Sequence, residues 1–236
     1  MTTWQADDVL YGAVQAFINA RCRRAYLHDV RGSLQAINTS FEALARSAKS
    51  GLQNNASLID RASSLARRAM EQHERDLADI FDQVADSESA AEIVNVSQLV
   101  QQSMQLLRND ARTKGITLRL SGCDDVRVLS QKNKLRSLIL GLLSLGIDAP
   151  SPGAELELDL SRSESFAVLE LRSDMTYAAI RDAHELLCRG PISLHPQELV
   201  LAFARHWITA NGGRVELPSP GVARSGLRIY HPLAPA

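Results

Sequence analysis

Apolar residues recur every three or four positions through the N-terminal third of the chain, and this period constrains the fold more than any other feature. The segment KSGLQNNAS at 49–57 interrupts the period with a glycine and two asparagines, and the period then resumes from Ile59 to Val84. The pattern predicts a helical hairpin with its turn near Gly51. The residues of the first stretch are Leu10, Ala13, Phe17, Ala20, Leu27, Val30, Leu34, Ile37, Phe41, Leu44 and Ala48.

A hairpin of two helices cannot enclose a core of its own. Two hairpins from two chains would form a four-helix bundle, which is the simplest way to bury both apolar stripes. We therefore expect residues 1–88 to form a dimerisation domain, with Leu10, Phe17, Phe41 and Ile80 in its core or dimer seam. His73 falls on the apolar stripe of the second helix and is expected to be packed there.

A second domain is expected over residues 89–236, after a polar linker at 85–96. Strictly alternating runs such as AELELDLS and FAVLELRS predict strands. Further strands are expected at ITLRL, VRVLS, GRVELP and GLRIYHP, and helices near 97–114, 132–149, 177–188 and 196–210. The order of these elements predicts an α+β chain in which the second domain is an α/β sandwich.

The composition argues against several classes of function. A net charge of −1 and 5% aromatic residues give no general reason to bind nucleic acid. The longest apolar run, Ser137–Ile147, is far shorter than the roughly 20 residues that span a bilayer. No secretory signal precedes the first helix, so we expect a cytoplasmic protein without membrane contact. No metal-ligand spacing is found for the cysteines (Cys22, Cys123, Cys188) or for the C-terminal histidines (His184, His195, His206, His231).

His28 is the candidate reactive residue, and it lies in RRAYLHDVRGSLQAI. Helix geometry gives it a basic face shared with Arg21, Arg24, Arg31 and Gln35. A neutral imidazole is nucleophilic near pH 7, and Asp29 could accept a hydrogen bond from one ring nitrogen. Gly32, one turn later, leaves room beside the ring. Spacing alone leaves the alternative open that His28 is an ordinary exposed helix residue.

The segment LHDVRGSLQAI resembles the H box of bacterial two-component sensor histidine kinases. The match falls on His28, Asp29, Val30, Arg31, Leu34 and Ile37. NVSQLVQQSMQLLRNDARTKGITLRL is similar to the family's entry into its ATP-binding domain, NKLRSLILGLLSLGIDA to its N-box helix, and ARHWITANGGRVEL to the helix and glycine pair after its last glycine box. The resemblance covers about residues 15–233 and implies that His28 is a phosphoryl acceptor.

The chain departs from this family where the family binds nucleotide. Gly141 and Leu145 stand where the N box has its two asparagines, and neither can coordinate magnesium. Asp174 is followed by bulky residues instead of spaced glycines, while Glu198 and Val200 replace the last glycine box. The resemblance therefore implies a degenerate ATP-binding domain that holds neither nucleotide nor metal. In the H box, Gly32 replaces the threonine or asparagine that helps to position water, which puts phosphatase activity in doubt.

These features resemble dimeric histidine phosphotransferases, which pass phosphoryl groups between receiver domains and do not use ATP. The expected partners are response regulator receivers, which would supply magnesium, and an upstream histidine kinase or hybrid kinase. Asp29 would orient the imidazole of His28 or act as its base, and the docking face would include Arg24, Arg31, Gly32 and Gln35. One alternative is a non-catalytic pseudokinase scaffold that regulates a response regulator or kinase. Another is an active ATP-dependent kinase.

Overall fold

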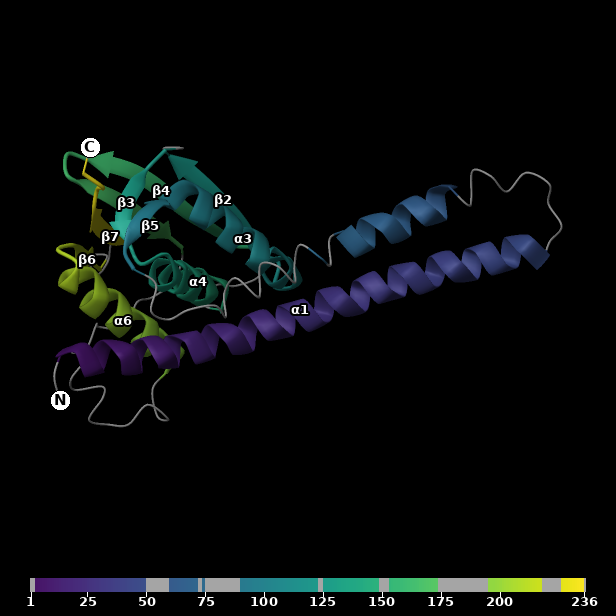
Figure 1. Ribbon diagram of the computed structural model, residues 1–236, viewed down its shortest axis with the longest axis horizontal. Helices are drawn as coiled ribbons and strands as arrows, with labels where there is room; N and C mark the ends of the chain where they lie inside the picture. The colour runs from purple at the N-terminus through teal and green to yellow at the C-terminus, as the bar shows by residue number, and fades with distance from the viewer. Residues whose placement is uncertain are drawn as a thin grey trace. The chain divides into compact units, whose positions relative to one another are not determined.

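The computed structural model describes residues 3–49, 60–71, 74, 90–122, 125–148, 153–173, 195–217 and 226–235. The chain divides into two compact units. The α/β unit comprises Met1–Arg21 and Asp86–Ala236, and the helical unit comprises Cys22–Ala85. Helix α1 (Thr3–Lys49) contributes residues to both (Figure 1). Residues 1–21, which we had assigned to the hairpin, therefore belong to the α/β unit.

The α/β unit is built on a mixed five-stranded sheet in the order β2-β4-β5-β7-β6. Its first pair, β2 and β4, is parallel, and the other neighbours are antiparallel. A separate antiparallel pair joins β1 to β3. The strands are β1 (Glu92–Asn95), β2 (Thr117–Gly122), β3 (Arg127–Ser130), β4 (Glu155–Ser163), β5 (Phe166–Arg172), β6 (Arg214–Glu216) and β7 (Leu227–Pro232). The predicted α+β class is confirmed. Our assignment of 85–96 to a linker was wrong at 92–95, which form β1 because they pair with β3.

Three helices of this unit, α3 (Val96–Thr113), α4 (Lys132–Asp148) and α6 (Pro196–Ala210), form a layer against the sheet (Figure 1). The Asn95 side chain caps α3 by accepting a hydrogen bond from Gln98 N at 2.9 Å. His195 caps α6, which begins with Pro196 at a position where no backbone donor is needed. Helix α6 ends at Asn211-Gly212-Gly213, with Asn211 as its C-cap and Gly212 at φ +78°.

The core of the α/β unit follows from the alternation in β4. Leu156, Leu158 and Leu160 are buried, whereas the intervening Glu157 and Asp159 are only partly covered. Since successive strand side chains point to opposite faces, one face of the sheet packs under the helices and the other carries charge. The helix predicted near 177–188 lies outside the described residues.

The first part of α1 is embedded in the α/β unit. Leu10, Tyr11, Val14 and Ile18 are buried. The stripe predicted from the sequence is not the buried one. It ran through Ala13 and Phe17, which are half-buried, and through Ala20, which is exposed. The prediction assumed that one stripe continues along the whole helix. The structure shows that this part of α1 packs on a different face.

The helical unit contains the rest of α1 and a second helical stretch at residues 60–71. Two predicted seam residues of α1 are exposed in the single chain, Leu34 by 61% and Phe41 by 63%. The turn near Gly51 and the residues His73 and Ile80 lie outside the described residues. The predicted four-helix bundle stays a prediction. Among the described helices, none has the length and apolar character needed to cross a bilayer.

Candidate functional site

The segment of α1 that carries His28 is helical throughout, because α1 runs unbroken from Thr3 to Lys49. The side chains of Arg24, His28 and Asp29 lie outside the described part of the structure. Arg31, Gly32 and Gln35 are exposed, as expected for a docking face. A Cβ atom added to Gly32 would have no neighbour within 4 Å. The segment can therefore present this face to a partner from a continuous helical backbone.

Helix α4, which carries Gly141 and Leu145, is packed on all sides. Every residue from Leu135 to Ile147 is buried, including Gly141 and Leu145. A Cβ atom added to Gly141 would lie 3.0 Å from Val200 Cγ1 and 3.1 Å from Val200 Cγ2. Gly141 and Val200 thus pack directly against each other. Gly141 allows α6 to approach α4 closely, and the Val200 side chain fills the space between the two helices.

Of the other candidate residues, the structure describes Glu198 and Val200 but not Asp174. Glu198 lies half-buried in the first turn of α6, and Val200, two residues later, is completely buried. Asp174 lies outside the described residues. The atoms nearest to a Cβ placed at Gly141 are the side-chain carbons of Val200. Within the described part of the chain, no three His, Cys, Asp or Glu side chains gather as metal ligands.

The N-terminal part of α1 packs against α4 and α6. Gln15 Nε2 donates a hydrogen bond to Ser137 Oγ of α4 at 3.0 Å. The Tyr11 ring lies 5.8 Å from the Phe203 ring of α6, measured between centroids. Lys134 Nζ lies 5.5 Å from the centroid of the Tyr11 ring. These contacts make the first turns of α1 a part of the helical layer rather than a free extension.

Arg21 joins α1 to two other helices at the end of this segment. Its Nη1 donates to Asp148 Oδ2 of α4 at 2.5 Å, and its Nη2 pairs with Asp110 of α3. Lys114 also pairs with Asp148. Burial raises the pKa of the Asp148 carboxyl, but hydrogen bonds from Arg21 and Lys114 outweigh it and hold that pKa below its usual range. We call Arg21, Asp110 and Asp148 the Arg21 clamp.

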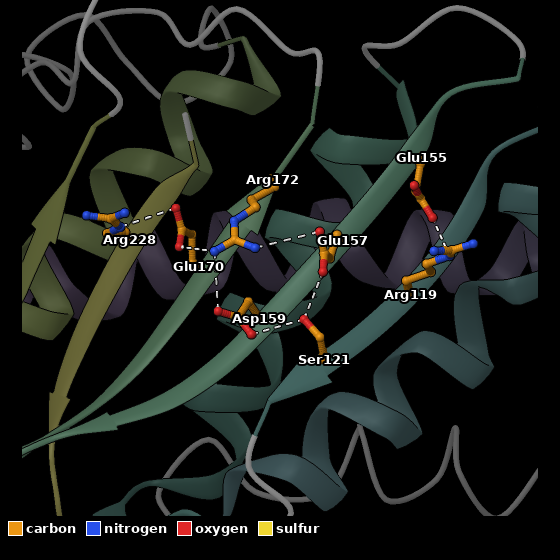
Figure 2. Close-up of polar contacts among 8 residues, drawn as sticks. All are labelled: Arg119, Ser121, Glu155, Glu157, Asp159, Glu170, Arg172 and Arg228. Atoms are coloured by element: carbon orange, nitrogen blue, oxygen red, sulfur yellow. Dashed lines mark hydrogen bonds and ion pairs between the residues drawn. The ribbon is translucent and has the colours of Figure 1, made fainter. Parts of the chain in front are cut away.

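The opposite face of the sheet carries a network of ion pairs across four strands (Figure 2). Arg172 lies at its centre, with Nη2 2.9 Å from Glu170 Oε2 and 3.4 Å from Asp159 Oδ2. Arg228 also pairs with Glu170, and Ser121 Oγ donates to Glu157 and Asp159. Burial raises the pKa of Glu170, but the hydrogen bond from Arg172 and the nearby Arg228 outweigh this effect and hold that pKa below its usual range. The carboxylates are thus matched by partners on neighbouring strands, which stabilises this face of the sheet.

Solved structures similar to this one are histidine kinases. The catalytic domain of the histidine kinase ThkA, in a nucleotide-free form, is matched over 63% of this chain and 100% of its own, at 14% identity and a TM-score of 0.51. The α/β unit has a histidine-kinase catalytic fold. A histidine kinase from Burkholderia phymatum STM815 is matched over 92% of this chain and 98% of its own, at 16% identity and a TM-score of 0.50. No protein-family model and no curated protein matches the sequence.

At sequence identities of 14% and 16%, the structural similarity establishes a kinase-type fold. The chemistry has to be argued from the residues of this chain. The fold places α4 and α6 side by side in the helical layer, and here Gly141 meets Val200 between them. The sequence pattern located both positions, but it did not show that they touch. The Arg21 clamp was missed altogether, since Arg21 lies 89 residues from Asp110 and 127 from Asp148. No local signal in the sequence links these three residues.

Proposed function

We propose that this protein is a histidine phosphotransferase of a two-component phosphorelay, in which His28 receives a phosphoryl group from one receiver domain and passes it to another. The observation that carries the proposal is the packing of α4. Gly141 lies against Val200, and the whole stretch from Leu135 to Ile147 is buried. On this proposal the kinase-type domain supplies no phosphoryl group of its own. His28 lies on a continuous helix and would then be phosphorylated by a partner.

The proposed reaction is a transfer between two side chains. A ring nitrogen of His28 attacks phosphorus in line, the new N–P bond forms, and the bond from phosphorus to the receiver's aspartate oxygen breaks. The aspartate leaves as a carboxylate with the bonding electron pair, and the proton of the other ring nitrogen stays on the imidazole. Asp29 would orient that ring by accepting its N–H. The receiver would supply magnesium, so this chain needs no cofactor.

The proposed docking face is formed by Arg24, Arg31, Gly32 and Gln35. Arginines suit the acidic rim of a phosphorylated carboxylate site because a guanidinium donates in a planar fork. The exposure of Arg31, Gly32 and Gln35, with no atom near Gly32, supports this assignment. A partner side chain could approach His28 over Gly32 without displacing anything that the structure describes.

A homodimer is part of the proposal. Leu34 and Phe41 are exposed apolar side chains of α1 at a helical spacing of seven residues, and Leu65 and Met70 are exposed in the second helical stretch. Exposed residues of this size at such spacing are typical of a bundle interface. A second copy of the same chain would cover them, which is how two hairpins form a four-helix bundle.

The test is phosphotransfer from receivers that have been phosphorylated with acetyl phosphate. Receiver domains from the same organism are mixed with the full chain, and phosphate on the chain is identified by its lability in acid and stability in base. We expect one or more receivers to label the wild type, and His28→Ala to abolish the label. His195→Asn is the matched control, since His195 is an exposed histidine whose capping role asparagine preserves.

Receivers that bind the chain without labelling it would overturn the transferase proposal and favour the pseudokinase scaffold. Label that appears with magnesium and ATP alone, in the absence of any receiver, would instead show that the chain is an active kinase. Saturable binding of magnesium-ATP in calorimetry would contradict our interpretation of the α4 packing.

A further inference from the structure

Strand β1 is an edge strand of the α/β unit. On one side it pairs with β3, with Val94 opposite Val128. In the part of the chain that the structure describes, no strand pairs with its other side. Val96 N donates to Val126 O at 2.8 Å in the same register. Because bonded residues alternate along an antiparallel pair, Val94 bonds β3, and Ile93 directs its N–H and C=O to the other edge.

A groove with a volume of about 180 Å³ lies along β1. It is lined by β1 itself, by Gln98, Leu99 and Gln102 of α3, and by Lys132, the first residue of α4. Among the described residues, the side chains of Gln102 and Lys132 have no hydrogen bond or ion pair. The groove therefore offers an amide and an ammonium group to a ligand that lies beside β1.

The charges around the groove favour an acidic ligand. Helices α3 and α4 both begin beside it, and neither has an acidic residue in its first turn. The N-terminal end of a helix carries a partial positive charge, and Lys132 adds a full one. Glu92 is the acidic residue among those that line the groove, and it offsets part of this charge. A carboxylate therefore matches the groove better than an ammonium group does.

The solvent face of the β1–β3 pair carries two exposed apolar residues. Ile93 is 63% exposed, and Leu129, directly opposite on β3, is 47% exposed. A residue that bonds Ile93 across the free edge would place its side chain on this face, beside Ile93. The residues before and after it would point to the other face, towards α3 and Lys132. The geometry thus fits an extended segment in which an apolar residue lies between acidic ones.

We propose that β1 binds an extended acidic segment of a partner protein, which adds to its free edge as a further strand. The main chain of Ile93 bonds the segment, and Lys132 pairs with one of its carboxylates. Ile93 and Leu129 cover its apolar residue. All these residues belong to the α/β unit. The proposal is therefore independent of the function proposed for His28.

The test uses a displayed library of random peptides, selected on the full chain and counter-selected on the Ile93→Pro variant. Proline is tolerated at an edge position whose N–H faces outward, but it removes that donor. Enriched peptides should carry an apolar residue between acidic ones. In fluorescence anisotropy they should bind Ile93→Pro about 10-fold more weakly than the wild type. Ile93→Val keeps the donor and is the matched control, which should bind as the wild type does.

The charge and the strand pairing are tested on an enriched peptide. Lys132→Gln should weaken its binding about 3-fold, and Glu92→Gln should strengthen it by a similar factor. In the wild type, bound peptide should slow hydrogen exchange of the Ile93 amide, measured by NMR, and leave the Val94 amide unchanged because it already bonds β3. No enrichment over Ile93→Pro, equal binding by Lys132→Gln, or an Ile93 amide that exchanges freely in the complex would overturn the proposal.

Discussion

Gly141 shows how one residue lets two helices of the α/β unit pack closely. The absence of a side chain lets α6 approach α4, and Val200 takes the space that a larger residue would need. Both residues are buried among apolar neighbours on α4 and α6. A polar side chain placed there would meet hydrocarbon instead of water or magnesium. Glycine at position 141 and the close packing of α4 on α6 therefore depend on each other.

Gly141→Asn should lower the free energy of unfolding by about 3 kcal/mol, because the new side chain overpacks the site and buries an amide without partners. The measurement is urea denaturation followed by circular dichroism. Gly32→Asn is the matched control, since a Cβ atom at Gly32 meets nothing within 4 Å, and it should change stability by less than about 0.5 kcal/mol. An unchanged stability of Gly141→Asn, together with new binding of magnesium-ATP, would show that the site opens readily.

Helix α1 is one element with two apolar faces. At about 100° per residue, the buried positions Leu10, Val14 and Ile18 lie within an arc of about 80°, and the exposed pair Leu34 and Phe41 lies roughly on the opposite side. The periodic apolar pattern predicted the helix correctly over its length. It did not predict the change of face. Steps of three and four residues can join apolar residues from both faces into what looks like one continuous stripe.

Leu10→Ala should destabilise the α/β unit by about 2–4 kcal/mol, because it leaves a cavity under a fully buried leucine. Val9→Ala, one residue earlier and 44% exposed, is the matched control and should cost less than about 1 kcal/mol. Unfolding would be followed by the fluorescence of Trp207, which is buried in α6, in a Trp4→Phe background. Equal effects of the two substitutions would show that the first turns of α1 contribute no core.

The whole molecule combines a kinase-type α/β unit with a helical unit that carries His28. On the proposed function, the first unit no longer supplies phosphate but still anchors the start of α1 through Leu10, Tyr11 and Arg21. The second unit exposes apolar residues that suit a second copy of the chain. Dimerisation and the anchoring of α1 thus depend on different residues, so each can be disrupted by its own substitution.

Phe41→Glu should convert the dimer into a monomer, because charges in the seam would have to be buried without partners. Light scattering after gel filtration measures the mass, and circular dichroism should show that the helices remain. Ala43→Glu, an exposed position about 160° away on the helix, should leave the dimer intact. A wild-type protein with the mass of one chain, or a Phe41→Glu variant that stays dimeric, would contradict the proposed seam.

Local pattern in the chain was sufficient to predict the secondary structure from Ser97 to Pro232, apart from residues that the structure leaves undescribed. Strand alternation and helix caps act between neighbours, so β4, β5 and α6 could be predicted without knowing the fold. His28, Gly141 and Val200 were likewise identified from residue type and order. The short strand β1 was missed because four residues carry little alternation and depend on pairing with β3.

The tertiary structure decided which of these residues act together. Contact between Gly141 and Val200, burial of the first turns of α1, and the pairing of Arg21 with Asp110 and Asp148 all join segments that lie far apart in the chain. Such contacts arise from packing of whole elements, and a residue carries no local sign of its distant partner. Hence Gly141 and Val200 could be singled out along the chain from residue type and order, but their contact could be found only in the fold.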